Sequence, residues 1–128
     1  MLKFASDPKN VARVESFVEH LVDKYGISPD VYGNILISLT EAVTNAITHG
    51  NDGDKTKIVQ VRLKKQNNRL AFLISDEGRG FDFDNLPDPT APENLLKIGG
   101  RGVFLMRQLS DDVAFYDNGS TVEICFSI

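Results

Sequence analysis

The sequence predicts an α+β two-layer sandwich, in which helices cover one face of a mixed, largely antiparallel sheet. Its strand and helix patterns follow in the order β, α, α, β, β, a long irregular segment, α, β, β, and short polar turns join neighbouring strands into hairpins. A helix layer on one sheet face is the economical way to bury the apolar sides of both. With 128 residues, 41% hydrophobic and 25% charged, the chain is expected to form one globular domain over residues 1–128.

Charge and cysteine content exclude several classes of protein. The net charge of -4 argues against sequence-independent binding of nucleic acid or of an anionic membrane, because both need clustered Lys and Arg. The single cysteine, Cys125, excludes a disulfide within the chain and is expected to be a buried or half-buried strand thiol. Neither a signal peptide nor an 18-residue apolar run is found, so we expect a cytoplasmic protein without a membrane partner.

The first 26 residues predict a short strand and a helix. The strand is expected within residues 1–6. Asp7 and Pro8 then favour a helix start, with Asp7 or Ser6 as the N-cap and Pro8 in the first turn. Apolar residues recur at helical spacing through about Lys24, and Gly26 is placed to end this helix.

A second helix is predicted from the Ser-Pro-Asp sequence at 28–30 to about His49, with Gly50 as its C-cap and the polar residues 50–54 as its breaker. Its apolar stripe should face the core and consists of Tyr32, Leu36, Leu39, Val43, Ala46 and Ile47.

The opposite side of this helix carries short polar side chains. Because each step of four residues drifts only about 40°, Glu41, Asn45 and His49 share one face, which Asn34 and Ser38 extend. Such residues have low helix propensity and hold their polar atoms close to the helix axis, which suits a bound ligand or metal. A plain solvent face is the alternative, and His49 in the last turn also favours the helix dipole.

Strand patterns fill most of the second half. The predicted strands are 57–65, 69–75, 113–116 and 121–128, and a helix is predicted over 103–109. Turns at 66–68 and 117–120 join these strands in pairs. Residues 85–98 form a long segment without periodicity, which is unusual in a compact domain unless it is a functional loop or lid.

Two glycine-rich stretches lie beside these elements. Asp76 ends the most apolar strand, where a carboxylate risks burial without a partner, and Gly78 and Gly80 follow it. Residues 99–102 contain three glycines and open the last helix, a position where backbone N–H groups and the helix dipole favour an anion such as phosphate. This stretch matches neither a Walker A loop nor a GxGxxG fingerprint.

Together these stretches resemble the nucleotide site of the GHKL (Bergerat-fold) ATPase/kinase superfamily. That site is built from an N-box, a D-x-G-x-G box and a second glycine box around a mobile lid, and the matching residues here are 40–50, 76–81 and 99–106. Within the superfamily the chain is similar to the small bacterial anti-sigma factor serine kinases. The resemblance covers essentially the whole chain.

The resemblance implies ATP and Mg²⁺ as cofactors and gives roles to individual residues. Asn45 would hold Mg²⁺ against the phosphates, Asp76 would accept a hydrogen bond from the adenine amino group, and Gly78 and Gly80 would shape the adenine pocket. These residue types fit, because Mg²⁺ prefers oxygen ligands and a carboxylate only accepts hydrogen bonds.

The same resemblance makes Glu41 the general base and places Gly100 and Gly102 along the phosphates. Arg101 departs from the apolar residue that some relatives carry at this position. For Arg101 and for Lys97 in the lid segment, three interpretations stay open: a γ-phosphate ligand, a partner contact or a solvated side chain.

The activity so implied is that of an ATP-dependent protein serine/threonine kinase, acting as an anti-sigma factor that phosphorylates an anti-anti-sigma antagonist. Its partners would be that antagonist and a sigma factor, and a homodimer is expected by the same analogy. Two alternatives from other classes are a non-catalytic ATP-binding interaction module and a detached histidine-kinase catalytic domain.

Overall fold

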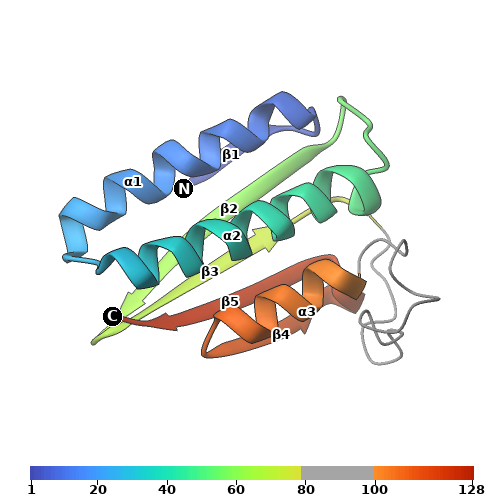
Figure 1. The fold of residues 1–128 in the computed structure, drawn as a ribbon. Helices are drawn as coiled ribbons and strands as arrows, with labels where there is room; N and C mark the ends of the chain where they lie inside the picture. The colour runs from blue at the N-terminus through green and yellow to red at the C-terminus, as the bar shows by residue number, and fades with distance from the viewer. Residues whose placement is uncertain (79–99) are drawn as a thin grey trace.

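The computed structural model describes residues 1–78 and 100–128, which form a layer of helices on one face of a five-stranded sheet (Figure 1). The strand order is β1-β2-β3-β5-β4, and every pairing among the described residues is antiparallel. The strands are β1 (Leu2–Ala5), β2 (Ile58–Gln66), β3 (Arg69–Ser75), β4 (Asp112–Tyr116) and β5 (Thr121–Ser127). The predicted α+β class is therefore confirmed, although no parallel pair lies within the described ranges.

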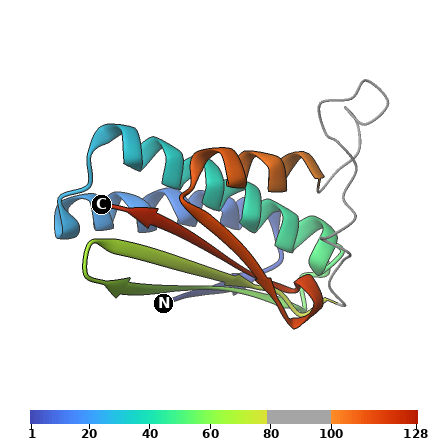
Figure 2. The same cartoon turned by 90° about the horizontal axis from the view of Figure 1, so that it is seen from below.

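The helices lie side by side above the sheet (Figure 2). They are α1 (Ala12–Tyr25), α2 (Pro29–Asn45) and α3 (Gly100–Leu109), with a 3₁₀ turn η1 (Pro8–Val11) before α1, a π-helical turn η2 (Ala46–Gly50) after α2 and a 3₁₀ turn η5 (Asp117–Gly119) before β5. None of the helices in the described part of the chain has both the length and the apolarity needed to cross a lipid bilayer.

The helix boundaries follow the predicted caps. The Asp7 carboxylate accepts the Lys9 N–H at 3.0 Å, and the Ser28 hydroxyl accepts the Val31 N–H at 3.4 Å. Gly26 adopts a left-handed φ of 64° and ends α1. Local sequence therefore fixes where α2 begins, and with it the register of its polar face.

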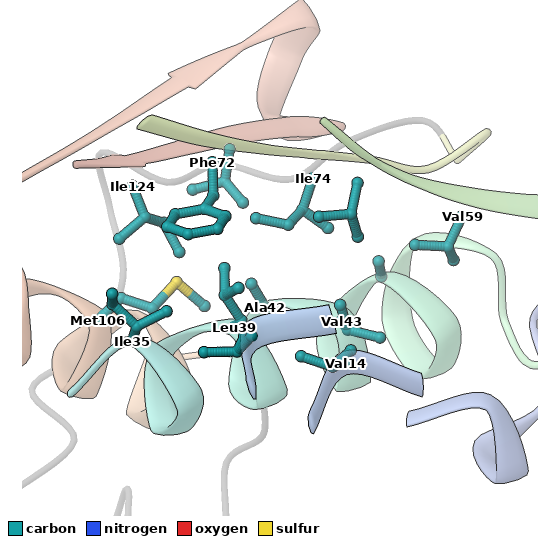
Figure 3. Close-up of a cluster of buried hydrophobic side chains, with 14 of the residues drawn as sticks. Val14, Ile35, Leu39, Ala42, Val43, Val59, Phe72, Ile74, Met106 and Ile124 are labelled. Carbon is teal, nitrogen blue, oxygen red and sulfur yellow. The ribbon is translucent and has the colours of Figure 1, made fainter. Parts of the chain in front are cut away.

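The core lies between the helix layer and the sheet (Figure 3). Leu39 and Val43 of α2 point toward Phe72 of β3 and Ile124 of β5, and all four are fully buried. Burying each such side chain contributes about 1.5–3 kcal/mol, so rotation of α2 about its axis would be costly. The free thiol of Cys125, on β5, is buried as expected.

The buried stripe of α2 is wider than the predicted one. Tyr32 and Leu36 are only half-buried, whereas Ile35, Ala42 and Ser38 are buried. The reason is that α2 lies between α1 and α3 as well as over the sheet, so three sides of the helix are covered (Figure 1).

Candidate functional site

The end of α2 differs in detail from the prediction. The helix continues to Gly50 as a π-helical turn, in which the Asn51 N–H donates to the Ala46 carbonyl at 2.8 Å. The predicted role of Gly50 as the C-cap is wrong, because Gly50 is the last residue of the π-helical turn and Asn51 is its C-cap. Glycine is needed here for another reason: a Cβ on Gly50 would overlap the carboxylate of Asp76.

Asp76 thus lies against the end of α2. Its backbone N–H donates to the Ser120 carbonyl at 3.0 Å, and its Oδ1 accepts the Gly78 N–H at 2.8 Å. Gly78 also approaches α2, because a Cβ on it would overlap the carbonyl oxygen of Gly50. Two stretches that the sequence singled out separately, residues 40–50 and 76–78, therefore meet in contact.

The Asp76 carboxylate is half-buried, and this burial raises its pKa above the ordinary 3.8. The Gly78 N–H and the charge of Lys57 oppose that rise. A desolvated carboxylate gains more from an added hydrogen-bond donor than one in water does. The position is therefore suited to accepting an N–H from a ligand.

The last turns of α2 face the first turn of α3. A Cβ built on Gly102 would lie 2.7 Å from Nδ2 of Asn45 and 3.2 Å from Oε2 of Glu41. The second glycine stretch thus lies directly on the carboxylate and carboxamide of the polar face. The free N–H groups of a helix start favour an anion at the same place.

The other residues of the polar face differ in how deeply they are buried. Ser38 is fully buried, and its hydroxyl has no hydrogen-bond partner within residues 1–78 and 100–128. Asn34 is half-buried, and His49 is exposed on the π-helical turn. Among these residues, Glu41 and Asn45 supply the atoms nearest to a Cβ built on Gly102 at the start of α3.

The donor chemistry fits a magnesium nucleotide. The described residues contain no group of three or more His, Cys, Asp or Glu that would cage a metal ion. A divalent cation beside Asn45 would take its other ligands from phosphate oxygens and water, and Mg²⁺ binds in this way because it gives up its waters reluctantly.

Several predicted site residues belong to the part of the chain between the two described ranges or border it. Gly80, Lys97 and the predicted lid 85–98 lie outside the described residues, as does the side chain of Arg101. Gly100 is already helical, so α3 begins within the glycine stretch and not at the predicted residue 103. The backbone groups expected to meet phosphate then belong to the first turn of α3 itself.

Asn51 is a residue that the sequence analysis missed. Interpreted there only as part of a helix breaker, it is fully buried and hydrogen-bonds three separate segments. Nothing in its local pattern distinguishes it from an ordinary turn asparagine, since its partners lie far away in sequence.

Known proteins are similar to this chain in sequence. A family model described as a histidine kinase-like ATPase domain matches residues 4–126. The serine-protein kinase RsbW of Bacillus licheniformis is 32% identical over 130 residues, covering 96% of this chain and 81% of that protein. The protein of the same name from Bacillus subtilis (strain 168) is 30% identical over 118 residues, covering 88% and 74%.

Among solved structures, a histidine kinase domain from the Erythrobacter litoralis EL346 blue-light activated histidine kinase is similar, with a TM-score of 0.61 and 22% identity. The match covers 94% of this chain and 60% of that one, and at this identity it supports the fold alone. The family match extends over nearly the whole described structure. The chain therefore belongs to the histidine kinase-like ATPase domain family.

Proposed function

We propose that this chain is an ATP- and Mg²⁺-dependent protein serine/threonine kinase that acts as an anti-sigma factor and phosphorylates an anti-anti-sigma antagonist. The observation that carries the proposal is the contact of Gly102 with both Glu41 and Asn45, near the end of the helix against which Asp76 also lies. This arrangement supports separate roles along α2: binding of the adenine ring beside Asp76, binding of the phosphate chain beside Asn45, and proton acceptance by Glu41. The names of the Bacillus relatives support the same activity.

In this proposal Asp76 recognises the adenine ring of ATP. The half-buried carboxylate accepts a hydrogen bond from the adenine amino group, with Gly78 and, by motif, Gly80 beside the ring. Guanine has a carbonyl oxygen where adenine has its amino group. That oxygen and the Asp76 carboxylate both only accept hydrogen bonds, so GTP binding is disfavoured.

Asn45, Gly100 and Gly102 then hold the phosphate chain at the start of α3. Bound Mg²⁺ would neutralise charge that develops on the transferred group. The glycines leave the helix N–H groups open to phosphate oxygens, and the missing side chain at Gly102 lets α3 approach Asn45 closely. Lys97 and Arg101 keep their three interpretations.

Glu41 acts on the incoming hydroxyl. The serine or threonine oxygen of the antagonist bonds to the γ-phosphorus, the bond from that phosphorus to the bridging oxygen of ADP breaks, and the hydroxyl proton passes to the Glu41 carboxylate. Phosphoprotein and ADP are the products.

The partners follow from the same proposal. They are the antagonist protein and a sigma factor, bound by a homodimer in the cytoplasm, without direct contact to nucleic acid or membrane. Light scattering of the purified protein measures the dimer, and co-purification with a candidate sigma factor measures the second partner.

The test uses labelled ATP, Mg²⁺ and a candidate antagonist, followed by acid. Acid-stable label on a serine or threonine of the antagonist is the expected result. Acid-labile label would indicate a detached histidine-kinase catalytic domain. Bound ATP without any transfer would indicate the non-catalytic module.

A further inference from the structure

We propose that Asn51 is a positioning residue for base recognition: its side chain closes a ring of hydrogen bonds that fixes the turn carrying Asp76. The inference rests on the proposed function, because it adds a specificity-determining residue to the same nucleotide site.

The ring contains three hydrogen bonds. The Glu77 N–H donates to Oδ1 of Asn51 at 2.8 Å, and Nδ2 of Asn51 donates to the Ile58 carbonyl at 3.2 Å. The Ile58 N–H then donates to Oε2 of Glu77 at 2.5 Å, which returns to the first residue. Glu77 is therefore held through both its backbone and its side chain.

The ring is anchored in the protein interior. Asn51 and Ser6 are each 0% exposed, and Nδ2 of Asn51 also donates to the Ser6 hydroxyl at 2.7 Å. That hydroxyl donates to the Lys57 carbonyl at 3.0 Å. Both amide N–H groups and the carbonyl oxygen of Asn51 are thus used, so another side-chain conformation would leave buried polar groups unpaired.

This anchor acts on Asp76 through the chain. Glu77 follows Asp76 directly, so holding the Glu77 N–H fixes the peptide plane between the two residues. Gly50 lies directly against the Asp76 carboxylate, and the Gly78 N–H donates a hydrogen bond to one of the carboxylate oxygens. Discrimination between an amino group and a carbonyl needs an acceptor held in one place, because a mobile one can turn away from the wrong base.

The experiment compares Asn51→Ala with the matched control Ser6→Ala, which removes a bond of the same buried network without touching Glu77. Affinities for ATP, GTP and inorganic tripolyphosphate are measured well below each unfolding temperature. Asn51→Ala is expected to weaken ATP binding by about tenfold, to reduce the preference for ATP over GTP, and to leave tripolyphosphate binding unchanged. Ser6→Ala should lower the unfolding temperature and keep the preference.

A second pair decides the question if Asn51→Ala does not fold. Glu77 is exposed, so Glu77→Ala opens the ring without creating a buried cavity. It should reduce the ATP preference by a smaller factor, and Glu77→Gln, which keeps an acceptor oxygen for the Ile58 N–H, should restore it. A loss of thermal stability with an unchanged ATP-to-GTP ratio in these variants would overturn the proposal.

Failure of the proposed function gives a different result. If the unmodified protein binds no ATP, the kinase proposal fails, and hydrogen exchange still tests the ring in the free protein. Asn51→Ala should speed exchange of the Glu77 amide by more than about tenfold, whereas Ser6→Ala should not. Equal exchange rates of the Glu77 amide in the unmodified protein and in both variants would show that the hydrogen-bond ring does not hold Glu77, and this would overturn the further proposal as well.

Discussion

The C-terminal part of α2 has two contact regions, an Asp76 end at Gly50 and a Gly102 end at Glu41 and Asn45, and they are built differently. At the Asp76 end, backbone groups and a fully buried asparagine hold the turn with hydrogen bonds of 2.5 to 3.2 Å. At the Gly102 end, Glu41 and Asn45 meet α3 only by close approach, and no hydrogen bond within the described residues ties either side chain. The Asp76 end is therefore held by hydrogen bonds within the fold, whereas the side chains at the Gly102 end keep their polar atoms free to bind a ligand.

This difference indicates that the two regions serve separate steps, nucleobase selection at Asp76 and phosphoryl transfer at Gly102. A base must be distinguished from similar bases, which requires a rigid acceptor, whereas phosphoryl transfer needs groups that bind only when nucleotide and substrate arrive. Changes at the Asp76 end should therefore alter selectivity, and changes at the Gly102 end should alter transfer.

The largest effect is expected at Glu41. Glu41→Gln keeps the shape and hydrogen-bonding capacity of the side chain but removes its basicity, so transfer to the antagonist should slow by about 10²–10⁴-fold with ATP affinity nearly intact. Single-turnover transfer and an ATP titration measure the two quantities. Thr44→Ala, an exposed position on the same helix, is the control. Transfer by Glu41→Gln at the unmodified rate would remove the general-base assignment.

Asn45→Ala should weaken Mg²⁺-ATP binding by at least about tenfold, and every ATP-dependent behaviour should weaken with it. ATP titrations with and without Mg²⁺ measure the change. A variant that loses affinity equally in both conditions would show that Asn45 does not act through the metal ion.

Gly102→Ala tests the contact itself. The added methyl group would lie 2.7 Å from Nδ2 of Asn45, so α3 or the amide must move, and transfer should fall by several-fold with an unchanged ATP-to-GTP preference. In a double-mutant cycle the effects of Gly102→Ala and Asn45→Ala on transfer should not add, because Asn45→Ala removes the Nδ2 atom with which the added methyl group would clash. Additive effects would place the strain elsewhere.

Nucleotide selectivity gives a smaller, equilibrium effect. At a concentration near 100 times its dissociation constant, ATP with Mg²⁺ should stabilise the protein by about 2.7 kcal/mol, GTP by far less, and Asp76→Asn should lose most of the ATP effect. Thermal unfolding measures these shifts. Equal stabilisation by ATP and GTP would show that Asp76 only ends β3.

The smallest effect is on the stability of the nucleotide-free protein. Because burial raises the pKa of Asp76 in the folded state above 3.8, ionisation of this group lowers the free energy of unfolding as pH rises from that value through the raised pKa. Asp76→Asn keeps the acceptor for the Gly78 N–H without the charge, so it should be slightly more stable than the unmodified protein at neutral pH and equal to it in acid. Urea unfolding across this pH range measures the difference, and a variant less stable at neutral pH would contradict the sign.

Local patterns predicted the parts of the molecule that neighbours in sequence decide. The caps at Asp7, Ser28 and Gly26 and the hairpins were predictable because turn and capping chemistry acts over a few residues. The spacing of Glu41 and Asn45 likewise sufficed to place them on one face.

What sequence reasoning missed depends on distant contacts. The reason for glycine at position 50 lies in Asp76, the partners of Asn51 lie in three other segments, and the burial of Ser38 follows from the neighbours of α2. A helical period tells which residues share a face, but it does not tell which faces other elements will cover.

The close approach of Gly50 and Gly78 has a consequence for reading nucleotide-binding motifs. A Cβ on Gly78 would overlap the Gly50 carbonyl, and a Cβ on Gly50 would overlap the Asp76 carboxylate, so a side chain at either position must displace backbone or the Asp76 side chain before any ligand arrives. A mutational screen that selects only for intracellular abundance, with no requirement for activity, should therefore reject side chains at both positions. Part of what is read as a ligand signature in this chain is a requirement for folding.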